Sequence, residues 1–178
     1  MTTQTTILIV DDHPMLRKGL RSLLDDESDM RVVGEAGDGR VAIERVRELS
    51  PDVVIMDITM PDIDGIAATR HIVTHFPGTR VVALSIHSGN RFVENMLRAG
   101  AAGYILKESV PEEMIDGIRT AMRGDVYLSA VITGTVVAAL VSSPPGTRSG
   151  EDSDGADAEE AVAGCLILTK PTFDTPFY

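Results

Sequence analysis

The 178-residue sequence is poor in several residue types that mark particular classes of protein: it has one cysteine, no tryptophan and 4% aromatic residues. A single cysteine excludes an internal disulfide framework, and no Cys/His cluster with the spacing of a zinc site occurs. No run approaches the roughly 18 uncharged apolar residues of a membrane span, and the start of the chain lacks the basic segment of a signal peptide. We therefore expect a cytoplasmic protein without membrane contact, built around an aliphatic core.

Basic residues are also scarce, since 16 Lys and Arg stand against 27 Asp and Glu, giving a net charge of −11. Residues 144–178 contain seven acidic and two basic side chains. A DNA-binding segment needs clustered cations that displace counterions from phosphates, so the sequence does not support DNA binding. The acidic, small-residue-rich composition of 144–178 instead predicts a largely disordered C-terminal tail.

Five apolar, β-branched runs alternate with helical patterns between residues 5 and 122. This alternation predicts an α/β fold, a doubly wound five-stranded parallel sheet with right-handed crossovers. With the strand order 2-1-3-4-5, counted along the chain, the first and third strands are neighbours. The predicted strands are 5–10, 30–36, 53–56, 80–84 and 103–106, and the predicted helices begin at Pro14, after Gly39, at Asp64-Gly65, at Arg91 (to 99) and near Pro111.

The composition changes after Gly124, so we assign residues 1–125 to this domain. Residues 127–141 are apolar and interrupted by glycine, and their pattern is ambiguous between helix and strand; we favour a helix from Ala130. We interpret residues 126–143 as a linker with helical potential, and 144–178 as the acidic tail.

Polar residues of different chemistry follow four of the apolar runs: Asp11-Asp12, Asp57, Ser85 and Lys107. Taken singly, each has an ordinary explanation as a helix cap, a turn residue or a solvated charge. The carboxyl ends of parallel strands meet at one edge of the sheet, however, and function collects there. The fold would therefore gather three carboxylates, a hydroxyl and an ammonium, which fits a magnesium-dependent site that accepts a phosphoryl group.

Within such a site, Asp57 is the expected phosphoacceptor, because it ends the central strand and a carboxylate can form an aspartyl-phosphate. Asp11 and Asp12 would hold Mg²⁺, a hard cation that binds a few carboxylates together with phosphate oxygens. The backbone carbonyl of Thr59 could complete the protein ligands. Lys107 would supply positive charge to the phosphoryl oxygens.

Ser85 would offer a hydroxyl donor to the same oxygens.

Two other classes of protein fit the sequence less well. A phosphatase of the haloacid-dehalogenase type would require a second Asp two residues after the nucleophile, where this chain has Thr59. A nucleotide-binding domain would require a Gly-rich phosphate loop, which residues 34–39 do not form.

Four segments carry a resemblance to a known family. VDDHPMLRKGLRSLL (10–24), DVVIMDITMPDIDG (52–65), LSIHS (84–88) and GAAGYILKE (100–108) resemble the receiver domain of two-component response regulators of the NarL/FixJ type. The resemblance covers about residues 5–125 and implies a flavodoxin-like receiver fold. It implies a phosphoacceptor rather than a conventional enzyme, with self-phosphorylation from small donors and autodephosphorylation as its only reactions.

By this resemblance, a partner histidine kinase phosphorylates Asp57, and Ser85 and Lys107 sense the phosphoryl group. Ser85 and Tyr104 form the switch, in which an inward swing of the tyrosine reports phosphorylation through the last two helices and the strand between them. From spacing alone, Tyr104 would be a half-buried aromatic residue. The resemblance leaves room for a homodimer formed on phosphorylation. The implied metal ligands are Asp11, Asp12, Asp57 and the Thr59 carbonyl.

Regulators of this type usually continue into a helix-turn-helix domain that binds DNA, but residues 144–178 show no amphipathic helix pair and no basic recognition helix. Three hypotheses for the output remain open. The chain is a stand-alone receiver acting by protein contact, a transcription regulator whose DNA-binding domain is missing, or a module that dimerises with intact relatives.

The histidines and the cysteine are given smaller roles. His13 belongs to the opening of the first helix, and His71 and His75 form a solvated helix face rather than a metal pair. His87, together with Thr59, is hypothesised to influence the lifetime of the phosphoryl group. Cys165 is taken as an incidental thiol.

Overall fold

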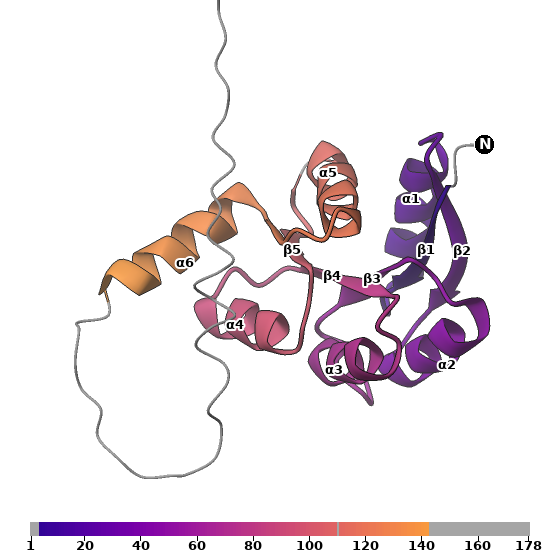
Figure 1. Ribbon diagram of the computed structural model, residues 1–178, viewed down its shortest axis with the longest axis horizontal. Helices are drawn as coiled ribbons and strands as arrows, with labels where there is room; N and C mark the ends of the chain where they lie inside the picture. Colours follow the sequence, from indigo (N-terminus) through magenta and orange to yellow (C-terminus); the bar gives the residue numbers. More distant parts are fainter. Residues whose placement is uncertain (1–3, 110, 143–178) are drawn as a thin grey trace, which may run out of the picture. The chain divides into compact units, whose positions relative to one another are not determined.

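The computed structural model describes residues 4–109 and 111–142 (Figure 1). The unit that contains them extends over residues 1–144, and residues 145–178 form a second unit. The predicted disordered tail over 144–178, including Cys165, lies outside the described residues and stays a prediction.

Strands and helices alternate along the chain as the sequence predicted (Figure 1). All strand pairs are parallel, and the sheet order is β2-β1-β3-β4-β5-β6. The doubly wound fold and the order 2-1-3-4-5 are therefore confirmed, with one further strand at the edge. The elements are β1 (Thr5–Val10), α1 (Pro14–Asp25), β2 (Met30–Ala36), α2 (Gly39–Leu49), β3 (Val53–Asp57), α3 (Gly65–His75), β4 (Arg80–Ser85), α4 (Asn90–Arg98), β5 (Gly103–Leu106), α5 (Pro111–Met122), β6 (Tyr127–Leu128) and α6 (Ala130–Ser142).

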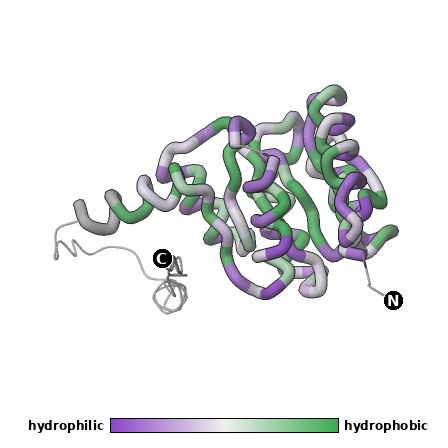
Figure 2. Tube along the Cα trace, turned by 90° about the horizontal axis from the view of Figure 1, so that it is seen from above, coloured by the Kyte–Doolittle hydropathy of each residue, from purple (hydrophilic) through white to green (hydrophobic). Residues whose placement is uncertain are grey.

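Helices cover both faces of the sheet, with α1 and α5 on one face and α2, α3 and α4 on the other (Figure 1). Side chains alternate between the faces of a strand, so Ile7 and Ile9 of β1 pack toward α1 and α5, while Leu8 and Val10 pack toward α2 and α3. Burial on both faces explains why the strands read as continuous apolar runs. Figure 2 shows hydrophobic strands in the interior and mixed hydropathy along the outer helices.

The helix starts that frame the carboxyl edge follow from local chemistry. Pro14 opens α1, where its missing N–H costs nothing. Asp38 and Asp64 cap α2 and α3, and each accepts a 2.8 Å hydrogen bond from a backbone N–H in the first turn. Helix α4 begins at Asn90, one residue before the predicted Arg91.

The ambiguous stretch after Gly124 contains both a strand and a helix. β6 pairs with β5, and α6 begins at Ala130, the residue favoured from the sequence. A two-residue strand is too short to show a period-two pattern, which is why the sequence did not reveal it. Ile132 of α6 is fully buried in a cluster with Val93, Met96 and Tyr104, so the described structure continues across residue 125.

Among residues 4–109 and 111–142, no helix combines the length and apolar character needed to cross a bilayer.

Candidate functional site

The carboxyl ends of four strands bring the predicted site residues to one edge of the sheet. β1 ends directly before Asp11 and is hydrogen-bonded to β3, which ends at Asp57. β4 ends at Ser85, and β5 ends one residue before Lys107. Because β2 and β3 lie on opposite sides of β1, this edge contains the topological switch point, where α/β folds place their ligands.

An acidic cluster occupies this edge. Asp11 and Asp57 are 0% and 3% exposed, whereas Asp12 and His13 reach solvent. One ligand atom from each of these four residues lies within 4.8 Å of those of the other three. Two buried carboxylates this close repel each other in a medium of low dielectric, so they need a cation nearby.

Lys107 supplies one cation. Its Nζ lies 2.7 Å from Oδ2 of Asp57 and 2.7 Å from Oδ2 of Asp11. Burial raises the pKa of Asp57; the hydrogen bond from Lys107 opposes this rise, and the charge of Asp11 reinforces it. Burial lowers the pKa of Lys107, but the hydrogen bonds to Asp11 and Asp57 outweigh it, so the net shift is upward and the ammonium keeps its proton.

The donor set fits a divalent metal ion. Within residues 4–109, these contacts set one ammonium, that of Lys107, against the three carboxylates of Asp11, Asp12 and Asp57, which leaves about two negative charges. Carboxylate oxygens are the ligands that Mg²⁺ prefers. The charge and the chemistry of these three carboxylates therefore fit a divalent cation such as Mg²⁺.

Thr59 and His87 face each other beside Asp57. The backbone N–H of Thr59 donates to Oδ1 of Asp57 at 3.3 Å, and Oγ1 of Thr59 lies 3.3 Å from Nε2 of His87. The His87 ring stacks on Phe92 of α4, with ring centroids 4.2 Å apart. The loops that follow β3 and β4 therefore meet beside Asp57.

Ser85 and Tyr104 are joined through the backbone of His87. The N–H of His87 donates to Oγ of Ser85 at 2.9 Å, and the hydroxyl of Tyr104 donates to the His87 carbonyl at 2.6 Å. Tyr104 is fully buried, so the half-buried position expected from spacing alone is wrong. The reason is that α4 and α6 both cover its side of β5. Burial raises the pKa of Tyr104, which keeps its hydroxyl a hydrogen-bond donor.

The other histidines differ in their relation to the site. Nδ1 of His13 lies 2.7 Å from Oδ1 of Asp12, so His13 belongs to the acidic cluster. His71 and His75 stack on each other on α3, at 4.1 Å between ring centroids, and neither belongs to the group of potential metal ligands found in the described part of the chain.

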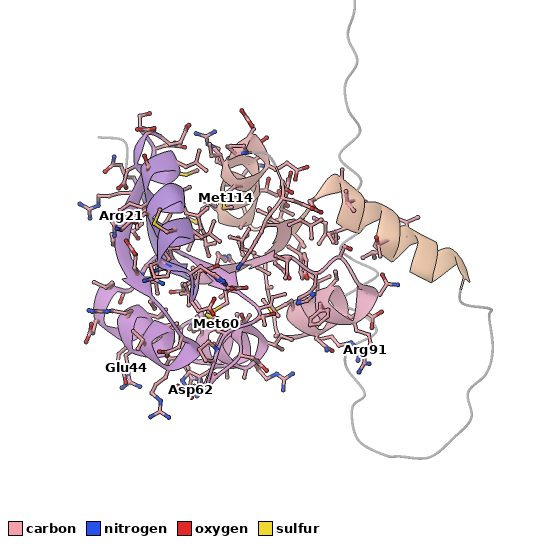
Figure 3. All side chains as sticks on the ribbon, turned by 180° about the vertical axis from the view of Figure 1, so that it is seen from behind. Arg21, Glu44, Met60, Asp62, Arg91 and Met114 are labelled. Carbon is pink, nitrogen blue, oxygen red and sulfur yellow. The ribbon has the colours of Figure 1, made fainter. Side chains whose placement is uncertain are left out.

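Sequence reasoning missed Arg17, which lies on α1 behind the acidic cluster. Its Nη1 donates to the backbone carbonyl of Asp11 at 2.5 Å, and its Nε lies 3.2 Å from Glu35. Arg21 also binds Glu35 and lies on the outer side of α1 (Figure 3). An arginine on an amphipathic helix reads as a solvated residue, and its backbone partner leaves no signal in the sequence.

Comparison with known proteins adds a family relationship. The sequence model of the response regulator receiver domain matches residues 7–119. The uncharacterized transcriptional regulatory protein YxjL of Bacillus subtilis (strain 168) is 39% identical over 131 residues, which are 74% of this chain and 60% of that protein. The oxygen regulatory protein NreC of Staphylococcus carnosus (strain TM300) is 39% identical over 138 residues, 77% of this chain and 64% of that protein.

Solved structures give the same result. The two-component response regulator of the LuxR family from Aurantimonas sp. SI85-9A1 superposes with a TM-score of 0.75 at 36% identity, covering 78% of this chain and 99% of that chain. The response regulator domain of Thermotoga maritima CheB superposes with a TM-score of 0.64 at 37% identity, covering 67% of this chain and 97% of that chain. The chain spans about 60% of the length of the curated relatives that it matches.

Proposed function

Since this chain belongs to the response regulator receiver family, we propose that it accepts a phosphoryl group on Asp57, drawn from a histidine kinase. The contact of the Lys107 ammonium with the buried Asp57 carboxylate carries this proposal. A buried acceptor with a fixed cation at 2.7 Å has a partner for the charge that the incoming phosphoryl oxygens bring.

In the transfer, an oxygen of Asp57 forms a bond to phosphorus while the bond from phosphorus to the donor's nitrogen or oxygen breaks. Asp11, Asp12, Asp57 and the backbone carbonyl of Thr59 would hold Mg²⁺, which when bound neutralises charge between the carboxylates and the phosphoryl oxygens. Lys107 keeps its ammonium beside the acceptor throughout, because the contacts with two carboxylates favour the protonated form. The reactions proposed for the chain are this phosphorylation, from a kinase or a small donor, and the hydrolysis of its own acyl phosphate.

Phosphorylation adds about −1.5 to −2 charge and three acceptor oxygens at Asp57. The Ser85 hydroxyl can donate to one of these oxygens. This movement would break the hydrogen bond that Ser85 now accepts from the N–H of His87. His87 also holds the Tyr104 hydroxyl and stacks on Phe92 of α4. A shift of Ser85 would therefore alter the contacts of Tyr104 and α4, and we assign the switch to Ser85 and Tyr104 on this basis.

Phosphorylation with acetyl phosphate and Mg²⁺, followed by intact mass spectrometry, tests the acceptor. The parent chain and Asp62→Asn are expected to gain one phosphoryl group, and Asp57→Asn none. Asp62 is a matched control because it is an exposed aspartate five residues away with a φ of 63°, a conformation that asparagine tolerates. Equal labelling of Asp57→Asn would refute the assignment.

The output is a separate proposal, because the chain matches only part of its relatives. Relatives named as transcriptional regulatory proteins support a role in transcription. We propose that the receiver domain contributes to it from the cytoplasm by contact with other proteins, and that phosphorylation favours a homodimer. DNA binding in a gel shift at physiological salt should be negligible, and nanomolar affinity would contradict this proposal.

A further inference from the structure

We propose that Arg17 is a positioning residue that orients Asp11 and Asp12 toward the metal ion. The inference rests on the proposed function, because these two aspartates are the proposed metal ligands. The observation behind it is the 2.5 Å hydrogen bond from Nη1 of Arg17 to the backbone carbonyl of Asp11. The Arg17 side chain is only 18% exposed, so water competes weakly for this carbonyl.

The carbonyl that Arg17 binds belongs to the peptide unit joining Asp11 to Asp12. A peptide unit is planar, so holding its oxygen fixes ψ of Asp11 and φ of Asp12 together. These two angles set the relative directions in which the Cα–Cβ bonds of both aspartates leave the backbone, and so where their carboxylates can reach. The neighbouring backbone is fixed as well, since the N–H of Asp11 donates to Ala36 at 3.1 Å and the N–H of His13 donates to Oδ1 of Asp11 at 2.7 Å.

Arg17 is itself held in place by Glu35 of β2. One carboxylate oxygen of Glu35 lies 3.2 Å from Nε of Arg17, and the other accepts a 2.7 Å hydrogen bond from Nε of Arg21. The hydrogen bond from Arg21, together with that from Arg17, holds the pKa of Glu35 below its usual value. A glutamate is ionised at neutral pH even without such a shift, so Glu35 can hold Arg17 with or without Arg21. A guanidinium can bind Glu35 and the Asp11 carbonyl at once because its donors form a rigid fork, which a lysine lacks.

The direction in which removal of Arg17 changes the Mg²⁺ affinity distinguishes a positioning role from a purely electrostatic one. A guanidinium near the acidic cluster repels a divalent cation, so if Arg17 acted through its charge alone, removing it would strengthen Mg²⁺ binding. If Arg17 orients the ligands, removing it weakens binding, as for other residues that hold metal ligands in place. Arg21 separates the two effects, since it carries the same charge on the same helix and binds the same Glu35, while its contacts are with Glu35, Asp25 and Val32 rather than Asp11.

The test is calorimetric titration of Mg²⁺ into the metal-free full chain. Arg17→Met should weaken the affinity about 10-fold or more, Arg17→Lys should also weaken it, and Arg21→Met should leave it unchanged or slightly tighter. Asp12→Ala is the positive control for loss of a ligand. Without metal, amide hydrogen exchange at Asp12 and His13 should accelerate in Arg17→Met and stay unchanged in Arg21→Met.

An affinity of Arg17→Met equal to or tighter than that of the parent overturns the inference and leaves the proposed function standing. A parent chain that binds no Mg²⁺ overturns the proposed metal site and the inference with it. If Arg17→Met does not fold, Arg17→Lys decides in its place: parent-like affinity in that variant would show that a point charge suffices and would also overturn the inference.

Discussion

Replacing Ile132 with alanine tests whether helix α6 is part of the folded domain. The substitution removes three carbon atoms from a fully buried side chain that packs with Val93, Met96 and Tyr104. At about 0.8 kcal/mol for each buried methylene, the lost burial amounts to about 2.4 kcal/mol, and the remaining cavity raises the cost within the usual range of about 2–5 kcal/mol. Alanine favours the helix by roughly 0.4 kcal/mol. We expect the free energy of unfolding to fall by about 2–4 kcal/mol.

The assay is denaturant unfolding of the full chain followed by circular dichroism, in which the midpoint should fall while the slope stays constant. Val131→Ala is the matched control, because the preceding side chain is 60% exposed and its truncation should change stability by less than about 0.5 kcal/mol. If Ile132→Ala behaves like Val131→Ala, α6 is not packed on this cluster. The domain would then end near residue 125, as the composition predicted.

Three further predictions concern the acidic cluster and the limits of the domain. Lys107→Met should slow phosphorylation from acetyl phosphate by about 10²-fold, measured as a mass time course, and an unchanged rate would remove Lys107 from the site. Because burial raises the pKa of Asp57 in the folded state, that state binds the extra proton, so the stability of the metal-free chain should fall as pH rises through this pKa. Thermal unfolding in the presence of a chelator should show this fall of stability with pH in the parent and a smaller fall in Asp57→Asn. An equal pH dependence in the two proteins would contradict the prediction. Residues 1–143 alone should keep the cooperative unfolding and the phosphorylation of the full chain, and loss of either would show that 144–178 contributes to the fold.

The local signals in the sequence were sufficient for the main elements. The strands that carry the site are buried on both faces, so they appear as uninterrupted β-branched runs such as residues 5–10 and 53–56. Helices α1 and α3 begin at a proline and after a capping aspartate, which act on adjacent backbone. β6 was not predicted from the sequence because it consists of two residues and forms only by pairing with the edge of β5.

For the site, the sequence placed Asp11, Asp57 and Lys107 at the ends of the first, third and fifth strands, and parallel pairing then had to bring them to one edge. The structure adds contacts that depend on where the side chains point, which the position of a residue at a strand end does not determine. The Lys107 ammonium bridges Asp11 and Asp57, and the backbone of His87 joins Ser85 to Tyr104.

The sequence by itself determined which residue types stand at the carboxyl ends of the strands, because the alternation of apolar runs and helix starts is a local property of the chain. Only the tertiary structure decided what those residues bind. Arg17 meets the Asp11 carbonyl because helix α1 packs back against β1 and β2, and Ile132 meets Tyr104 because α6 folds over α4 and β5. Both contacts join a side chain to a surface formed by other segments, so spacing along the chain does not encode them.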